Sequence, residues 1–407
     1  MPTPTPEQTQ AAESMVLTGD CLTVVASMPS DSFDSIVTDP PYGLSFMGKA
    51  WDHQVPDSSY WKEFLRVAKP GAHLVAFGGT RTWHRLACAI EDAGWELRDT
   101  LSWMYGQGFP KSLDVSKAID KAAGAERTEV IGKRHRNVKP FDDDNGWNAN
   151  GTTGDHAYTA PATDAARQWS GWGTALKPAW EPIIVARKPL CGTVAENVLR
   201  YGTGGINVDG CRVGTEAVTI NTWNDGAKPF GGGAGHEYTG RTVQGRWPAN
   251  VVLDAEAAQA LDEQTGTLTS GKVTKTYTRI TRNSVALGTK ERNLSPNNVY
   301  SDSGGASRFF YVAKASTAER THGGNVQNTH PTVKPVALMR WLSKLITPPG
   351  GKVLEPFAGS GTTIVACLEE GFECLGVEQS TENAAIAKAR VALTLAQQSA
   401  PRSKGKI

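Results

Sequence analysis

The sequence predicts an α/β protein built on a mostly parallel sheet, and three observations lead to that fold class. Short apolar runs alternate with helical patterns from residue 14 to residue 106. The same alternation returns between residues 336 and 395, and the long segment between the two is rich in glycine, asparagine and tryptophan. Strands that alternate with helices along the chain are typical of parallel sheets with crossover helices. We therefore expect the two ends of the chain to share one sheet, with an insertion between them.

The N-terminal half supplies four expected strands and three expected helices. The strands are expected at 14–20, 34–41, 72–79 and 97–106. The helices are expected at 21–28, 60–71 and 81–94. In the second helix Trp61, Phe64 and Leu65 recur at helical spacing, and the Lys-Pro-Gly sequence at 69–71 is a stop signal.

The C-terminal half continues the pattern. Helices are expected at 336–346, 362–371 and 381–395, and strands at 351–359 and 372–379. Within the middle segment, residues 181–190 resemble a strand, and the apolar runs at 248–254 and 308–315 indicate further order. Because long loops in a compact protein are more often functional than idle, we expect the middle segment to carry part of the function.

Composition restricts the function classes. Of the 407 residues, 42 are Lys or Arg and 41 are Asp or Glu, so a polyanionic partner would have to bind a local basic patch. The six cysteines form no CxxC pair, which argues against a zinc site and a disulfide scaffold, and we expect no metal and reduced thiols in a cytoplasm. No stretch approaches the roughly 18 apolar residues of a membrane span, so we expect a soluble protein.

The sequence TDPPYG at 38–43 follows an apolar run directly. Pro41 makes the peptide after Pro40 a tertiary amide, which stiffens the turn and directs the Pro40 carbonyl. The Asp39 carboxylate and that carbonyl are then suited to accept both hydrogens of a planar NH₂ group, and the Tyr42 ring is suited to stack on the ring that carries the amine. An ordinary surface turn with a packing tyrosine is the alternative interpretation.

The sequence LEPFAGSGTT at 354–363 places Gly359 and Gly361 between a strand and a helix. Small residues at such a turn let a ligand approach the backbone and the helix N-terminus. Glu378 ends the next strand about 20 residues later, where an acid commonly binds ribose hydroxyls. The pattern favours a nucleoside cofactor, although many strand-to-helix turns contain glycine for conformational reasons alone. The chain has no GxxxxGK[ST] phosphate loop, so ATP is not favoured.

Taken together, these motifs resemble the DNA amino-methyltransferases, which use S-adenosyl-L-methionine (SAM). The order TDPPYG, then HPTVKP at 330–335, then FAGSGTT resembles the β group of that family, and residues 108–121 resemble phage and prophage members. The resemblance implies a Rossmann-like, circularly permuted, seven-stranded mixed sheet of order 3-2-1-4-5-7-6. It divides the chain into a disordered leader (1–13), a catalytic half (14–190, with a loop insertion at about 107–175), a target-recognition insertion (191–306), a SAM-binding half (307–395) and a disordered tail (396–407).

The resemblance also implies roles for individual residues. Asp39 and Pro40 would hold the target amine in the turn that Pro41 stiffens, and Tyr42 would stack on the base. The residues implied in SAM binding are Asp20 at the adenine, Glu378 at the ribose, Phe357, Gly359 and Gly361 at the methionine part, Lys334 at the carboxylate, and Cys21, Glu355, Ser360, Thr362 and Thr363 around them. Glu355 stands where this family usually has aspartate.

The implied activity is site-specific methylation of double-stranded DNA in a bacterial cell, or in host cytoplasm if the protein is phage-encoded. Asp rather than Ser before PPY favours N6 of a flipped-out adenine. N4 of cytosine, an RNA base or protein amide, and a catalytically silent DNA-binding relative are the alternatives. A homodimer and a separate cognate endonuclease are left open. The basic run between residues 263 and 291 suggests DNA contact by Lys272, Lys275, Tyr277, Arg279 and Arg282.

Overall fold

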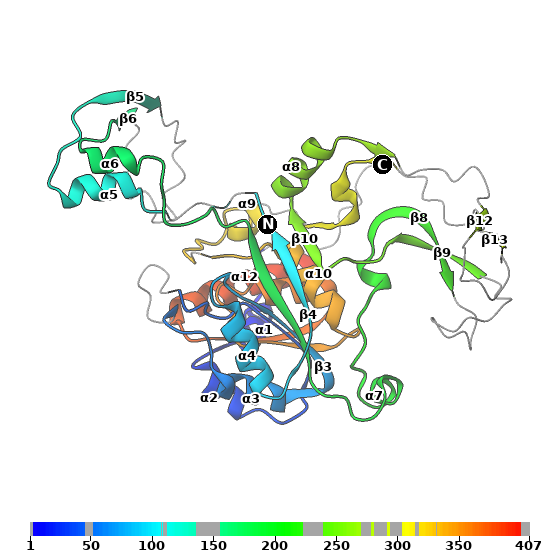
Figure 1. Ribbon diagram of the computed structural model, residues 1–407. Coiled ribbons are helices and arrows are strands. Elements are labelled where there is room, and N and C mark those ends of the chain that lie inside the picture. The colour runs from blue at the N-terminus through cyan, green and yellow to red at the C-terminus, as the bar shows by residue number, and fades with distance from the viewer. Residues whose placement is uncertain are drawn as a thin grey trace.

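A nine-stranded mixed sheet runs through the protein (Figure 1). The computed structural model describes residues 3–44, 52–106, 108, 112–135, 155–222, 239–269, 278–280, 291–293, 303–313, 317–330 and 332–399. From one edge to the other the strands are β1 (Val16–Thr18), β17 (Glu373–Glu378), β16 (Lys352–Glu355), β2 (Phe33–Thr38), β3 (Ala68–Phe77), β7 (Trp180–Arg187), β4 (Glu96–Met104), β10 (Val251–Asp254) and β15 (Tyr311–Ala313).

The first seven of these strands stand in the order that the sequence predicted, so the predicted fold class is confirmed. Among the described strands of this sheet, β7 alone runs antiparallel to both of its neighbours, β3 and β4. The predicted number of seven strands is wrong, because β10 and β15 continue the sheet beyond β4 in parallel. Val252 and Leu253 of β10 are buried, so this addition covers an edge whose backbone groups would otherwise be unpaired.

Helices cover both faces of the sheet because its strands are apolar on both sides. Ile36 and Leu74 face a core formed with α2 (Cys21–Ala26), α3 (Ser58–Val67) and α4 (Trp83–Asp92). Their neighbours Val37 and Val75 face the opposite core. The helices of that second face are α1 (Pro6–Met15), α10 (Val336–Ile346), α11 (Thr362–Glu370) and α12 (Thr381–Ser399).

The predicted disordered leader over residues 1–13 is wrong, because α1 begins at Pro6. Thr5 and Gln8 form a reciprocal capping box at its N-terminus, and Ala12 is buried in the core beside α12. The predicted tail also begins too early, since α12 continues to Ser399 and buries Ala396. Residues 400–407 lie outside the described part of the chain.

Two insertions leave the sheet. The predicted loop insertion at 107–175 contains α5 (Val115–Ala122), β5 (Val130–His135), β6 (Asp155–Thr159) and α6 (Asp164–Gln168), which lie away from the sheet (Figure 1). The predicted insertion at 191–306 is not separate from the sheet, because it contributes β10. Its other described elements are α7 (Val194–Tyr201), η4 (Asp209–Cys211), β8 (Val213–Thr222), β9 (Thr239–Arg246), α8 (Ala255–Thr265), β11 (Leu268–Thr269), β12 (Thr278–Ile280), β13 (Glu291–Asn293) and β14 (Ser303–Gly304).

Two short helices connect this region to the C-terminal half, η5 (Ala306–Phe309) and α9 (Thr317–Thr321). No helix in the described ranges is long and apolar enough to cross a membrane.

Candidate active site

The carboxyl end of β2 continues into residues 39–42, which we call the proline turn. The buried Asp52 carboxylate fixes this turn, since it accepts hydrogen bonds from the backbone N–H groups of Tyr42 (2.7 Å), Gly43 (2.9 Å) and Leu44 (3.3 Å). The Thr82 hydroxyl donates to the Tyr42 carbonyl at 2.6 Å. The local conformation is therefore held by side chains from outside the motif.

Four polar groups meet at the proline turn, and we call them the Asp39 cluster: Asp39, Tyr42, Glu181 and Lys334. The Lys334 Nζ donates to Asp39 Oδ2 at 2.7 Å and to Tyr42 Oη at 3.0 Å, and it lies 3.2 Å from Glu181 Oε2. The Tyr42 hydroxyl lies 2.8 Å from Asp39 Oδ1 and 2.9 Å from Glu181 Oε2. Asp39 thus has a cation on one oxygen and a phenol on the other.

The Lys334 ammonium is held in its charged form. Burial alone would lower the pKa of Lys334, but the Asp39 and Glu181 carboxylates outweigh that effect and raise it above the ordinary value. Burial, followed by the same two carboxylates, raises the pKa of the Tyr42 hydroxyl well above its usual range. The cluster at neutral pH therefore contains an ammonium and a protonated phenol.

The second wall of the site is residues 355–363, which we call the glycine loop. Gly359 and Gly361 have φ values of +52° and +79°, in the left-handed region that favours glycine. The Gly359 N–H donates to Glu378 Oε2 at 2.8 Å, and the Ser380 N–H donates to Glu378 Oε1 at 2.8 Å. Burial raises the pKa of this carboxyl, which is 8% exposed.

The side chains of Ser360 and Thr362 are engaged by a buried arginine. Arg390 of α12 donates from Nη1 to the Ser360 carbonyl (2.6 Å), to the Ser360 hydroxyl (3.0 Å) and to the Thr362 hydroxyl (3.0 Å). Its side chain is fully buried, and burial lowers the pKa of its guanidinium to about 10, so the group stays charged at neutral pH. Arg390 therefore fixes the backbone of the glycine loop.

Glu355 joins the two walls. Its carboxylate accepts hydrogen bonds from the Thr38 hydroxyl (2.6 Å) and the Phe357 N–H (3.0 Å) on one oxygen and from the Thr363 hydroxyl (2.6 Å) on the other. The residue is 1% exposed, and burial raises the pKa of its carboxyl to about 7 against the lowering effect of these hydrogen bonds. Glu355 and Thr363 are thus joined to each other, and through Thr38 they tie the glycine loop to β2.

Residues at the start of α2 form the third side. The Asp20 carboxylate caps α2 by accepting the Thr23 N–H at 2.9 Å. Burial raises the pKa of the Cys21 thiol to about 12, so it is not a thiolate. The Phe357 ring packs on Tyr60, with ring centroids 6.3 Å apart. Asp20, Cys21, Tyr60 and Phe357 all line the same cavity.

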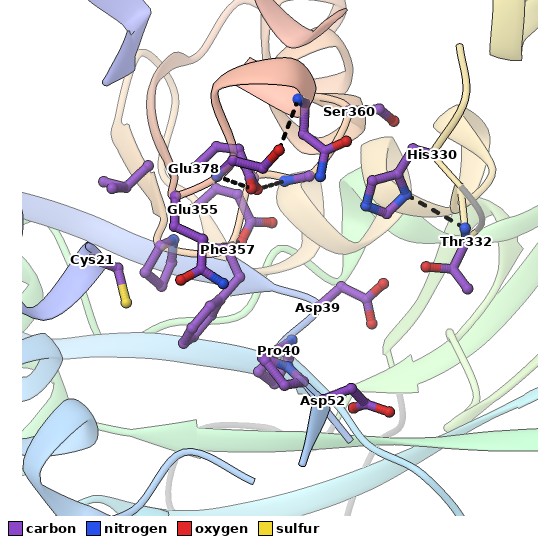
Figure 2. A pocket seen from close by; sticks show the side chains of 18 of the residues that line it. Cys21, Asp39, Pro40, Asp52, His330, Thr332, Glu355, Phe357, Ser360 and Glu378 are labelled. Carbon is purple, nitrogen blue, oxygen red and sulfur yellow. Dashed lines mark hydrogen bonds between the residues drawn. The ribbon is translucent and has the colours of Figure 1, made fainter. Parts of the chain in front are cut away.

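The three sides enclose one cavity of about 1110 Å³. Figure 2 shows Asp39 and Pro40 together with Phe357, Glu378 and His330 around it. All but one of the predicted catalytic and cofactor residues line it: Asp20, Cys21, Asp39, Pro40, Pro41, Tyr42, Lys334, Glu355, Phe357, Gly359, Ser360, Thr362, Thr363 and Glu378. Gly361 lies behind the wall, where a Cβ would come within 2.9 Å of the Ala387 Cβ.

Several residues of the cavity were not predicted as site residues: Asp52, Tyr60, Trp103, Glu181 and His330. The quoted HPTVKP motif contains His330, whose imidazole lies so close to the glycine loop that a Cβ on Gly359 would meet its Nε2 at 3.1 Å. Burial lowers the pKa of His330, so the ring is neutral at pH 7. The HPTVKP motif could therefore have indicated His330 as a site residue.

The predicted DNA contacts mostly fall outside the described residues: Lys272, Lys275, Tyr277 and Arg282. Arg279 lies in β12, whose backbone pairs with β13, and its side chain is outside the described part. No group of three or more potential metal ligands occurs among the residues that the structure describes.

The cavity fits the nucleoside cofactor that the sequence implied. Glu378 is held at its edge by two backbone N–H groups, which leaves carboxylate lone pairs suited to ribose hydroxyls. Gly359 lets a ligand approach the loop backbone closely. Tyr60 and Phe357 offer apolar surface on the side of the cavity that Asp20 also lines.

Comparisons with known proteins give the family. Among curated proteins, the type II methyltransferase M.SmaI of Serratia marcescens is 48% identical over 63 residues, or 16% of this chain and 22% of that protein. The type II methyltransferase M.HindIII of Haemophilus influenzae is 28% identical over 152 residues, or 37% of each. The chain therefore matches less than half the length of these relatives.

Two solved structures align along most of the chain. The M1.HpyAVI complex with SAM is 15% identical with a TM-score of 0.39, and the match covers 93% of this chain and 98% of that one. The PvuII DNA methyltransferase, described as cytosine-N4-specific, is 13% identical with a TM-score of 0.41, over 92% and 85%. A family model described as DNA methylase matches residues 33–389, which include the proline turn, Lys334 and the glycine loop. The protein belongs to this N6/N4 family of DNA methylases, whose methyl donor is SAM.

Proposed function

We propose that the protein is a site-specific DNA methyltransferase that transfers the methyl group of SAM to N6 of an adenine flipped out of double-stranded DNA. The observation that supports this proposal is that the proline turn and the glycine loop line one cavity, although Asp39 and Gly359 are remote in sequence. An acceptor for a planar amine thus lies beside a site that suits a nucleoside methyl donor.

When bound, SAM supplies an activated sulfonium methyl group. Asp39 and the Pro40 carbonyl accept the two N–H groups of the target amine, so that its nitrogen lone pair faces the methyl carbon for in-line attack. On methyl transfer the amine nitrogen would form the new N–C bond, the sulfur would keep the electron pair of the broken C–S bond, and the amine would release one proton to the solvent. Tyr42 lies where its ring meets the flipped base, which offsets part of the few kcal/mol that flipping costs.

Adenine is proposed because the proline turn begins with Asp39, whereas serine at this position more often accompanies cytosine in the family. Residues 191–306 are proposed to read the target sequence. We further propose that the enzyme acts in the cytoplasm.

The test is to incubate the protein with deuterium-labelled SAM and either duplex DNA of mixed sequence or, in a parallel reaction, RNA, and to analyse the nucleosides by mass spectrometry. We expect labelled N6-methyldeoxyadenosine. Labelled N4-methyldeoxycytidine as the sole product would replace adenine with cytosine, and labelled RNA without labelled DNA would refute the proposed substrate.

Asp39→Ala tests the residue roles. Without the carboxylate we expect methyl transfer to fall about 1,000-fold or more, because amine alignment is lost, while SAM affinity changes less than about threefold. Single-turnover rates and calorimetric SAM titration measure the two effects. Unchanged turnover in this variant would refute the role of Asp39.

A further inference from the structure

Glu181 has no role in the mechanism proposed above, yet it contacts the groups that do. It is the second residue of β7, and because β7 runs opposite to β2, its first residues lie at the edge of the sheet where β2 ends. Its carboxylate lies 2.9 Å from Tyr42 Oη and 3.2 Å from Lys334 Nζ. The Asp39 cluster therefore contains two carboxylates that share one ammonium.

The ion pair between Lys334 and Asp39 conflicts with the proposed role of Asp39 as the acceptor of the target amine. The target amine is a neutral donor, whereas the Lys334 ammonium that already occupies Asp39 Oδ2 at 2.7 Å is a charged one. The amine and the ammonium would both form charge-assisted hydrogen bonds with the Asp39 carboxylate, but the ammonium adds the Coulomb attraction of an ion pair. A base that enters the cavity must therefore compete for Asp39 with a donor that is bound more strongly.

Lys334 cannot simply move away to water. Its side chain is only 9% exposed, and an ammonium left buried without a carboxylate costs several kcal/mol. Its Nζ also lies 5.3 Å from the centre of the Tyr42 ring and 4.8 Å from that of Phe77, which favour a cation at this depth. The partner within reach is Glu181, to which a shift of the ammonium requires little movement.

We propose that Glu181 is a positioning residue that receives the Lys334 ammonium when the target amine binds Asp39. The inference rests on the proposed function of Asp39. Two carboxylates and one ammonium give the cluster a net charge of −1 before and after the exchange, and no proton is transferred. Asp39 thereby becomes an acceptor for the base without leaving a buried charge unpaired.

Glu181→Gln tests the exchange, with single-turnover methylation at saturating SAM and DNA and a separate SAM titration. Without the second carboxylate, Lys334 stays on Asp39, and we expect the rate to fall about 30-fold while SAM affinity stays within about threefold. Glu181→Asp keeps a carboxylate and is expected to recover part of the loss. Retained SAM binding reports that each variant is folded.

The double variant Glu181→Gln/Lys334→Met distinguishes exchange from a structural role. Removal of the competing ammonium is expected to raise the rate about tenfold above that of Glu181→Gln alone, whereas losses of two structural groups would add. The matched control is Glu96→Gln, which removes an ion pair with Arg187 (2.6 Å) at the far end of the same strand pair and should leave the rate unchanged.

Two results would overturn the inference: a wild-type rate in Glu181→Gln, or a double variant no faster than that single variant. A wild-type protein that labels no DNA would instead refute the proposed function itself. The two failures are therefore distinguishable in one set of reactions.

Discussion

The glycine loop and the proline turn face each other across one cavity, but they are held by different means. The glycine loop is fixed from behind by Arg390 and Glu355, which are 0% and 1% exposed. The proline turn has a fixed backbone, but the carboxylate it presents is bound by Lys334 in a cluster whose acids are 22% and 21% exposed. The glycine loop can be rigid because nothing in it has to be displaced when the cofactor binds. The proline turn must receive a neutral amine on Asp39, so the group that already binds Asp39 has to be displaceable.

The largest effect is expected from Arg390→Met, which removes the support of the glycine loop. The Ser360 carbonyl and the Thr362 hydroxyl would lose a charged donor in a buried place, so we expect the free energy of unfolding to fall by about 2 to 4 kcal/mol. SAM affinity should fall about tenfold or more as the loop loosens. Urea unfolding and calorimetry measure these quantities.

The matched control on the same helix is Lys388→Met. Lys388 forms an ion pair with Glu13 at the surface, and such pairs contribute at most about 1 kcal/mol. If the Arg390 and Lys388 variants lost equal stability, the glycine loop would not be held from behind, and the contrast between the two walls would fail.

A pH-dependent effect of similar size is expected from Glu355→Gln. Because the pKa of Glu355 is raised from its ordinary 4.5 to about 7, the folded protein binds more protons than the unfolded chain between these values, so its stability falls as the pH rises through this range. The Gln variant carries no such charge. We expect it to gain about 3 kcal/mol relative to the wild type between pH 4.5 and pH 8.

Urea unfolding of both proteins over that pH range gives the difference curve, in which the titration of all other groups cancels. A curve that is flat with pH would mean that Glu355 ionises normally. In that case the tie between the glycine loop and β2 would be an ordinary hydrogen-bond network without an electrostatic cost.

The sequence predicted the sheet better than it predicted the site. Alternating patterns and the motif order suffice for seven strands, because each has an apolar run of its own. The strands β10 and β15 also lie in apolar runs, but the seven-stranded pattern of the family has no place for them, so the sequence did not assign them to the sheet. The helix α1 was missed because its signal is the capping box of Thr5 and Gln8, not an apolar face.

For the site, motifs identified residues but not their partners. Asp39 and Lys334 were both predicted, but their ion pair spans 295 positions and follows only from the folded topology. Glu181 had a usable signal, since an antiparallel seventh strand must begin where its parallel neighbours end. Asp52 had no usable signal, because an aspartate in a loop that binds the backbone of a nearby turn belongs to no recognisable sequence motif.

The smallest effect is expected from a pair of glycines that flank α11. Gly361 and Gly371 have nearly equal φ values of +79° and +80°, so alanine carries the same backbone strain of about 1 kcal/mol at either position. A Cβ on Gly361 would meet the Ala387 Cβ at 2.9 Å, whereas one on Gly371 would have no atom within 4 Å. Gly361→Ala should therefore cost about 1 kcal/mol more stability than Gly371→Ala, and should weaken SAM binding as well, because α12 and the glycine loop would be pushed apart. Equal losses in urea unfolding, with unchanged SAM affinity, would mean that the glycine loop can shift to admit a methyl group and is not held rigidly against α12.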